Sequence, residues 1–169
     1  GTLSTASNNT GLGWEVFDDL TSGDNNTAVG YQALAKNTTA SNNTAFGYQA
    51  LLDNTTGADN VAIGVLALEN NTTGVNNVGS GREALGANTE GSNNVAVGYR
   101  SLLSNTTGAE NVAIGKGALD ANTTASSNVG VGNNALGANT TGTENVAVGA
   151  ASTDANTEGS YNTALGSGS

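Results

Sequence analysis

The chain has 169 residues, including 25 glycines but no Pro, Cys, Met or His, with 4% aromatic and 11% charged residues. So few large side chains argue against a packed helical domain, and the absence of Cys and His removes thiolate chemistry and nucleophile–histidine pairs. A net charge of −10 with four basic residues excludes a phosphate-tracking surface, and no stretch approaches the ~20 apolar residues of a membrane span.

A 17-residue repeat runs through the whole chain without insertion or deletion, which predicts one repeat domain over residues 1–169. We number its positions 1 to 17 from an asparagine that is present in every unit, so that an equally constant glycine occupies position 5. The asparagines are Asn9, Asn26, Asn43, Asn60, Asn77, Asn94, Asn111, Asn128, Asn145 and Asn162. The glycines are Gly13, Gly30, Gly47, Gly64, Gly81, Gly98, Gly115, Gly132, Gly149 and Gly166.

Three segments follow one another within each unit. Positions 1 to 5 read Asn-Val-Ala-Val-Gly, as in Asn94–Gly98, and this alternation predicts a short strand. Positions 6 to 9 read Tyr-x-Ala-Leu, as in residues 31–34, and predict a second, weaker strand. Positions 12 to 15 read Asn-Thr-Thr-Gly, as in Asn105–Gly108, and predict a turn.

One such unit cannot bury its own Val and Leu, but stacked units can. The repeat therefore predicts an all-β fold, a parallel β-solenoid (β-roll) of about ten rungs at a spacing of ~4.8 Å. Equivalent residues then form columns, with a ladder of asparagine amides and a column of glycines where the backbone turns or packs closely. Position 3 is always Ala or Gly, which we interpret as a face approached by another copy of the chain, and we expect a homotrimer.

The segment Asn94–Leu102, and its counterpart at residues 26–34, resembles the head repeats of YadA-like trimeric autotransporter adhesins and similar repeats of bacteriophage tail fibres. The resemblance covers essentially the whole chain. It implies a parallel β-roll assembled from three chains in a surface fibre. The unit here is longer than the usual head repeat by its Asn-Thr-Thr-Gly turn.

The acidic residues do not recur at one fixed position, so we interpret them as a solvated acidic surface and expect no enzyme activity. We expect no cofactor; calcium, bound through oxygen ligands, is the one plausible structural metal. Asn-x-Thr sequons occur at Asn37, Asn54, Asn71, Asn105, Asn122 and Asn139. Turn chemistry alone selects this pairing, and glycosylation additionally requires passage through a glycosylating compartment.

Threonine occupies position 13 in nine consecutive units, and a regular ladder of this kind resembles an ice-binding face. This candidate surface ladder comprises Thr21, Thr38, Thr55, Thr72, Thr89, Thr106, Thr123, Thr140 and Thr157. Tyr31, Tyr48 and Tyr99 share position 6 and are interpreted as packing residues, with exposed stacking as the alternative. Trp14 and Phe17 break the pattern in the first unit, where they are expected to form a partial plug.

The favoured function is that of a structural or adhesive module in an extracellular fibre, on a cell surface or a virion. The alternatives are a filament subunit that stacks head to tail and an ice-binding solenoid. Expected partners are further copies of the chain and host-surface glycans or proteins, without nucleic acid or membrane insertion. The lack of capping elements in the sequence is consistent with a fragment of a longer fibre or with a filament subunit.

Overall fold

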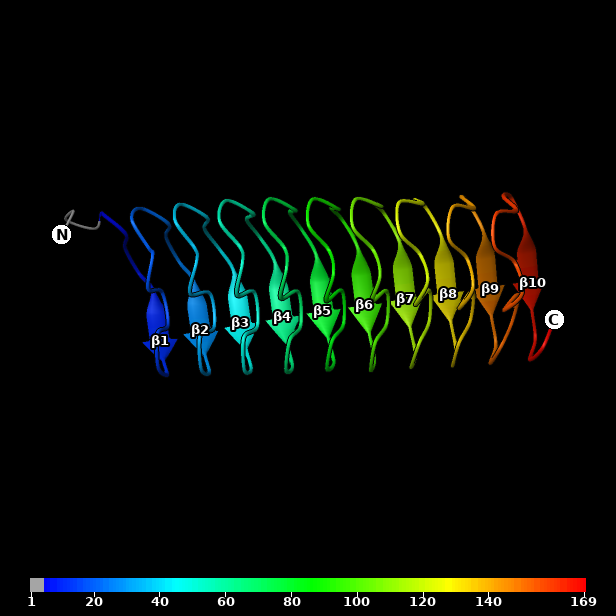
Figure 1. The fold of residues 1–169 in the computed structure, drawn as a ribbon, viewed down its shortest axis with the longest axis horizontal. Helices are drawn as coiled ribbons and strands as arrows, with labels where there is room; N and C mark the ends of the chain where they lie inside the picture. The colour runs from blue at the N-terminus through cyan, green and yellow to red at the C-terminus, as the bar shows by residue number, and fades with distance from the viewer. Residues whose placement is uncertain (1–4) are drawn as a thin grey trace.

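The computed structural model describes residues 5–169 as one all-β coil (Figure 1). Ten three-residue strands form a single parallel sheet in chain order, so each strand pairs only with its sequence neighbours. They are β1 (Thr10–Leu12), β2 (Thr27–Val29), β3 (Thr44–Phe46), β4 (Val61–Ile63), β5 (Val78–Ser80), β6 (Val95–Val97), β7 (Val112–Ile114), β8 (Val129–Val131), β9 (Val146–Val148) and β10 (Thr163–Leu165). The predicted parallel β-solenoid is confirmed, with about nine turns between β1 and β10.

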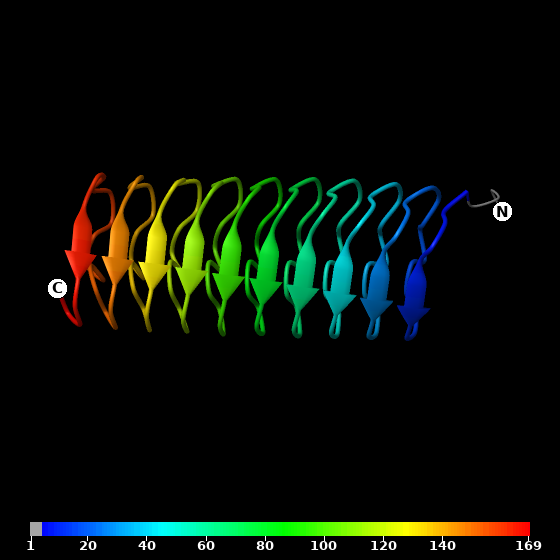
Figure 2. The same cartoon turned by 180° about the vertical axis from the view of Figure 1, so that it is seen from behind.

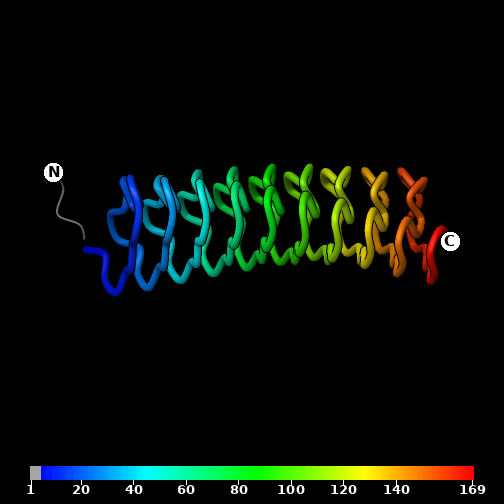
Figure 3. Tube along the Cα trace, turned by 90° about the horizontal axis from the view of Figure 1, so that it is seen from below, coloured from blue at the N-terminus to red at the C-terminus, as the bar shows by residue number. Residues whose placement is uncertain are grey.

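The pairing register is constant at one repeat from end to end. Val95 of β6 pairs with Val78 of β5 on one side and with Val112 of β7 on the other. The rungs stack evenly along one long axis in two views (Figures 2 and 3). At the usual strand spacing of ~4.8 Å, ten rungs extend roughly 45 Å. Equivalent side chains therefore lie above one another in columns.

The prediction of a second strand at positions 6 to 9 is wrong. Positions 7 and 9 have left-handed backbone, as in Gln32 (φ +53°) and Leu34 (φ +52°), so this segment is a turn. The Gln32 N–H donates to Trp14 of the preceding rung at 2.8 Å, whereas the Leu34 N–H donates to Ala50 of the following rung at 3.1 Å. Ala33 and Leu34 are both fully buried, which the alternating side chains of a strand would not allow.

Position 3 was interpreted as a face that another copy of the chain approaches. This is also wrong, because the small side chains at position 3 point into the coil. Ala62 and Ala96 are fully buried, whereas the flanking residues at positions 2 and 4 face outward. The interior of a typical rung holds one leucine at position 9 and small residues at positions 3 and 8. Position 3 is small because this narrow interior has no more room: a methyl group added at Gly79 would lie 3.3 Å from the Leu68 side chain.

The first rung fills the same space with different side chains. Phe17 takes the place of the usual leucine and, with Val16, packs against the core. Gly11 stands at position 3 there, where a methyl group would come within 2.8 Å of Val16. Trp14, by contrast, is 68% exposed, so the expected partial plug involves Phe17 but not Trp14.

Two columns of buried asparagines occupy the rest of the interior, at positions 1 and 12. In the rung that begins at Asn94, the Nδ2 groups of Asn94 and Asn105 both donate to the carbonyl of Gly108, each at 2.9 Å. The Asn94 Oδ1 accepts the backbone N–H of Asn111 at 3.0 Å, which joins this rung to the next. The side chains therefore close each rung across its interior and also fix its neighbour, and both asparagines are fully buried.

The glycine column at position 5 is required by both backbone angle and rung contact. Gly98 has φ +131°, a region that L side chains rarely adopt. A Cβ atom at Gly98 would also collide with the backbone of Gly115 in the next rung. The corner after each strand is therefore closed to any side chain.

Replacement of one interior asparagine should destabilise the coil strongly. In Asn94→Ala, the buried N–H of Asn111 loses its acceptor and the Gly108 carbonyl loses one donor. Since an unsatisfied buried group costs about 1–3 kcal/mol, we expect the free energy of unfolding in urea to fall by about 2–4 kcal/mol. The matched control is Asn133→Ala, an exposed asparagine whose backbone is not left-handed. An equal, small effect of both substitutions would contradict the assigned role of the interior amides.

Candidate interaction surface

The position-13 threonines form a continuous column, but their hydroxyl groups are engaged within the coil. The Thr72 Oγ1 donates to the Thr89 carbonyl at 3.0 Å, and that carbonyl also accepts the N–H groups of Thr72 and Thr73. The same side-chain bond recurs in every step from Thr21 to Thr157, at 2.8 to 3.3 Å. The column thus stabilises rung stacking, and it is half-buried over most of its length.

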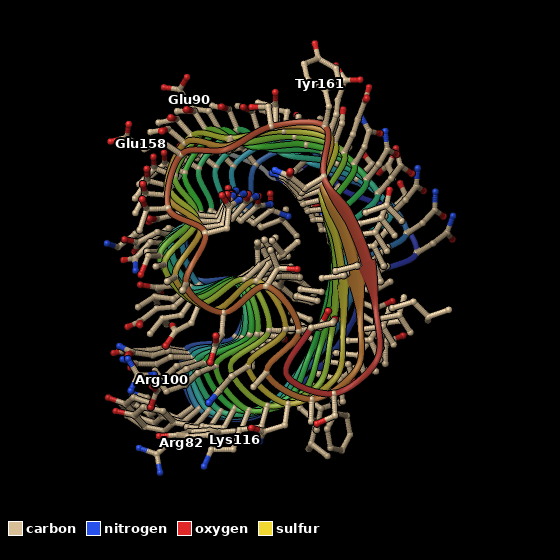
Figure 4. The ribbon with its side chains drawn as sticks, turned by 90° about the vertical axis from the view of Figure 1, so that its right-hand side faces the viewer. Arg82, Glu90, Arg100, Lys116, Glu158 and Tyr161 are labelled. Atoms are coloured by element: carbon tan, nitrogen blue, oxygen red, sulfur yellow. The ribbon has the colours of Figure 1, made fainter. Side chains whose placement is uncertain are left out.

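A second column of this turn, at position 14, has exposed threonines in six rungs: Thr39, Thr56, Thr73, Thr107, Thr124 and Thr141. Glu90 and Glu158 interrupt this column and lie together at one corner of the cross-section (Figure 4). Any ice contact through hydroxyl groups would use this interrupted column, because the donors of position 13 are occupied.

The ice-binding hypothesis is tested by measuring thermal hysteresis. We expect none at millimolar protein, since the outward column is broken by two carboxylates. Hysteresis that disappears in Thr73→Leu but persists in Thr72→Val would contradict this expectation and assign the activity to the exposed column.

The six sequons singled out in the sequence place their asparagines inside the coil. Asn37, Asn54, Asn71, Asn105, Asn122 and Asn139 all belong to position 12 and are fully buried. Asn71, for example, donates to Asn54 Oδ1 at 2.8 Å and to the Gly74 carbonyl at 3.0 Å. A glycan on such an amide is incompatible with the folded rung, which favours turn and core chemistry as the reason for these sequons.

Three of the four basic residues lie in three adjacent rungs. Arg82, Arg100 and Lys116 project together at one corner of the cross-section (Figure 4). Glu83 lies between the two arginines, 2.9 Å from Arg82 Nε and 3.7 Å from Arg100 Nε. These are solvent-accessible ion pairs, which typically contribute less than about 1 kcal/mol.

Two carboxylates border a shallow hollow of about 320 Å³ near the C-terminal end. Asp120 and Asp154 both occupy position 10, two rungs apart, with Gly137 between them. Burial raises the pKa of Asp120; the Glu83 carboxylate adds to this and Arg100 opposes it. Within residues 5–169, no three His, Cys, Asp or Glu side chains gather in a group that could hold a metal ion.

Apolar side chains dominate a different part of the surface, on both sides of the glycine corner. We call the outward residues of position 4 the strand column and those of position 6 the corner column. Eleven of the twelve exposed large hydrophobic residues in the described chain belong to these two columns. They are Leu12, Phe46, Ile63, Val97, Ile114 and Leu165 in the strand column, and Trp14, Tyr31, Tyr48, Val65 and Tyr99 in the corner column. This surface was not expected from the sequence, because the recurring Val residues were expected to be buried between stacked units.

The three tyrosines of the corner column are exposed rather than packed inside, and two of them, in neighbouring rungs, stack on each other. Tyr31 and Tyr48 are 43% and 47% exposed, and their rings are parallel within 10° with centroids 5.3 Å apart. The adjacent position-7 side chains form a polar ladder, in which Gln49 donates to Gln32 and Gln32 donates to Glu15. The interpretation of these tyrosines as packing residues is therefore wrong, and the alternative of exposed stacking holds for Tyr31 and Tyr48.

The chain matches no family model, no curated protein and no solved structure. The fold is therefore established by the structure alone, and the resemblance to adhesin heads and tail fibres stays a prediction. In the described part of the chain, no helix is long and apolar enough to cross a bilayer.

The stability of the coil should increase on mild acidification. Burial raises the pKa of Glu69, with the carboxylates of Asp53 and Glu83 adding to the effect, and the pKa of Asp120 is raised as described above. The folded state therefore binds these protons more tightly than the unfolded chain does. The free energy of unfolding then falls as pH rises from the ordinary glutamate pKa of 4.5 through the raised pKa of the folded state. We expect the melting temperature to increase when the pH is lowered from 7 to 5.

The double variant Glu69→Gln and Asp120→Asn should flatten this pH dependence. The control, Glu90→Gln and Glu158→Gln, removes the same net charge from exposed positions. If both pairs changed the slope equally, the general relief of the −10 net charge, rather than burial, would be its cause.

Proposed function

We propose that this chain is a structural module of an extracellular fibre, in which a rigid rod of stacked rungs spaces or presents other parts of the assembly. The observation that carries the proposal is the uniform bonding between rungs. In all nine steps from Asn9 to Asn162, the position-1 asparagine of one rung accepts, through its Oδ1, the backbone N–H of the position-1 asparagine of the next rung, at 2.8 to 3.0 Å. Such a coil transmits load along its axis, because each rung is fixed to the next in the same way.

The distribution of chemical groups supports a structural role over a catalytic one. The amides and hydroxyls that repeat most regularly are consumed in rung-to-rung bonds. What the rod presents outward is repetitive: threonines at position 14, dispersed carboxylates and the two apolar columns. A surface of this kind suits self-assembly or adhesion to another repetitive surface, such as a host glycan. On the cell surface or a virion, the role would rest on length and rigidity.

Head-to-tail filament formation is the second candidate, favoured by the strand edges of β1 and β10. Each pairs with one neighbour only, which leaves an edge able to accept a further strand in the described chain. Micrographs distinguish the two candidates, because a filament lengthens with protein concentration whereas a discrete module does not.

A tandem fusion tests the proposed role directly. When two copies are joined so that the 17-residue register continues across the junction, a rod-forming module should double from roughly 45 Å to roughly 90 Å. The control fusion carries eight extra residues at the junction, which breaks the register and should introduce a bend. Globular or equally bent particles from both fusions would contradict a load-bearing rod.

A further inference from the structure

The chain holds ten Asn-x-Thr sequons, and four of them lie outside the buried position-12 column. Three of these four share position 17, the last of the unit: Asn8, Asn25 and Asn42. All three are exposed, with left-handed backbone at φ +58° to +61°. Figure 4 shows the direction of this column, since Tyr161, its last member, projects outward from a corner of the cross-section. These sequons therefore present their asparagines to solvent.

The threonine of each position-17 sequon also lies on the outside of the coil. It occupies position 2, where Thr10 and Thr27 are exposed and Thr44 is half-buried. The residue between is the position-1 asparagine, and Asn26 and Asn43 are fully buried there. The inward asparagine thus separates two outward groups, so that both recognised residues of the sequon face solvent.

The side-chain amides at position 17 can carry a substituent without losing their own hydrogen bond. Asn8 Nδ2 donates to Asn25 Oδ1 at 3.2 Å, and Asn25 Nδ2 donates to Asn42 Oδ1 at 3.3 Å. A sugar on Nδ2 replaces one of its two hydrogens, which leaves the other for this bond. At position 12, by contrast, Asn71 uses both hydrogens inside the coil, toward Asn54 and Gly74.

The fold does not require this pairing of residues. Position 2 is Val in six rungs, and position 17 also accepts residues such as Glu110 and Ser127. Asn76 and Asn93 share the exposed, left-handed position 17, but Val follows two residues later and they form no sequon. Turn chemistry therefore explains the position-12 sequons and leaves the three at position 17, in the first three rungs, without a structural reason.

The fourth sequon outside the buried column, at Asn70, differs in its contacts. Asn70 is exposed, but its Nδ2 donates to the Gly86 carbonyl at 2.7 Å. Its threonine, Thr72, is half-buried and donates its hydroxyl to the Thr89 carbonyl at 3.0 Å. Both groups of this sequon are engaged in rung stacking, so we expect it to stay unmodified.

We propose that Asn8, Asn25 and Asn42 are acceptor sites for N-linked glycosylation of the folded rod. In the transfer, the asparagine Nδ2 bonds to C1 of a sugar activated by a diphosphate, the C1–O bond to the diphosphate breaks, and Nδ2 releases one proton. The transferase acts after folding, because a sugar on a position-12 amide would prevent its rung from closing. The three glycans would stand in a row at one end of the rod, one rung (~4.8 Å) apart.

Transfer in vitro to the folded chain tests the three sites. One reaction contains UDP-glucose and a soluble N-glycosyltransferase, and a second contains a lipid-diphosphate oligosaccharide and an oligosaccharyltransferase. Peptide mapping by mass spectrometry should place sugar on Asn8, Asn25 and Asn42, with Asn76 and Asn93 unmodified. The intact mass should rise from 16.5 kDa by at most three transferred units, and the donor that is used identifies the source of the sugar.

Two matched variants separate the sequon from general exposure. Thr27→Val should remove the sugar from Asn25 alone, and it introduces the residue that position 2 carries in six other rungs. Val95→Thr completes a sequon at Asn93 and should make that asparagine an acceptor. Both variants should retain the circular dichroism of the wild-type chain, because position 2 accepts either residue.

A peptide spanning residues 100–112 is the positive control, because its sequon at Asn105 is intact but no longer buried. Transfer to this peptide without transfer to the three sites of the folded chain would overturn the inference. Transfer to Asn76 in the folded chain, or to Asn25 in Thr27→Val, would also overturn it. The structural role is unaffected by either result, since it is tested by the shape of the tandem fusion.

Discussion

The structure depends on one arrangement: in seven successive rungs, from Asn26 to Glu144, a single backbone carbonyl accepts hydrogen bonds from two buried asparagine amides. The carbonyl of Gly108 accepts from Asn94 and Asn105, and the Oδ1 of Asn94 then holds the N–H of the next rung. With one leucine per rung, hydrophobic burial is small, and the interior instead relies on satisfied polar groups. Because each amide is bonded within its rung and to its neighbour, a rung is complete only when the next one is stacked on it.

This polar interior explains which sequence features are constant. Position 1 retains asparagine because its side chain donates, accepts and fits above its own kind, and position 5 retains glycine because the backbones of successive rungs touch there. Position 9 carries leucine in left-handed backbone, an uncommon conformation for that residue. Its complete burial and its N–H bond to the following rung offset that cost, as Leu68 shows through its bond to Ala84 at 3.0 Å.

The architecture could be predicted from the sequence, but the facing of its side chains could not. An unbroken 17-residue period fixes the parallel stacking and the columns, since any other coil length would scatter Asn94 and Asn111 over different faces. The direction of each side chain depends on dihedral angles at single positions. The left-handed turn at Gln32 and Leu34 reverses the expected pattern, so that Ala28 points inward and Val29 outward. The alternation of large and small side chains along a strand does not indicate which of its two faces is buried. We therefore expected the large residues inside, whereas the small ones are buried.

The same reversal determines what the rod presents outward. Small residues inside leave aliphatic and aromatic ones outside, in the strand and corner columns. The most direct measurement of the underlying claim is hydrogen exchange of asparagine side-chain amides by nuclear magnetic resonance. We expect slow exchange for the Nδ2 protons of Asn60, Asn71, Asn94 and Asn105, with fast exchange for exposed Asn93. Fast exchange of all of them in the folded protein would contradict an interior held together by amide columns.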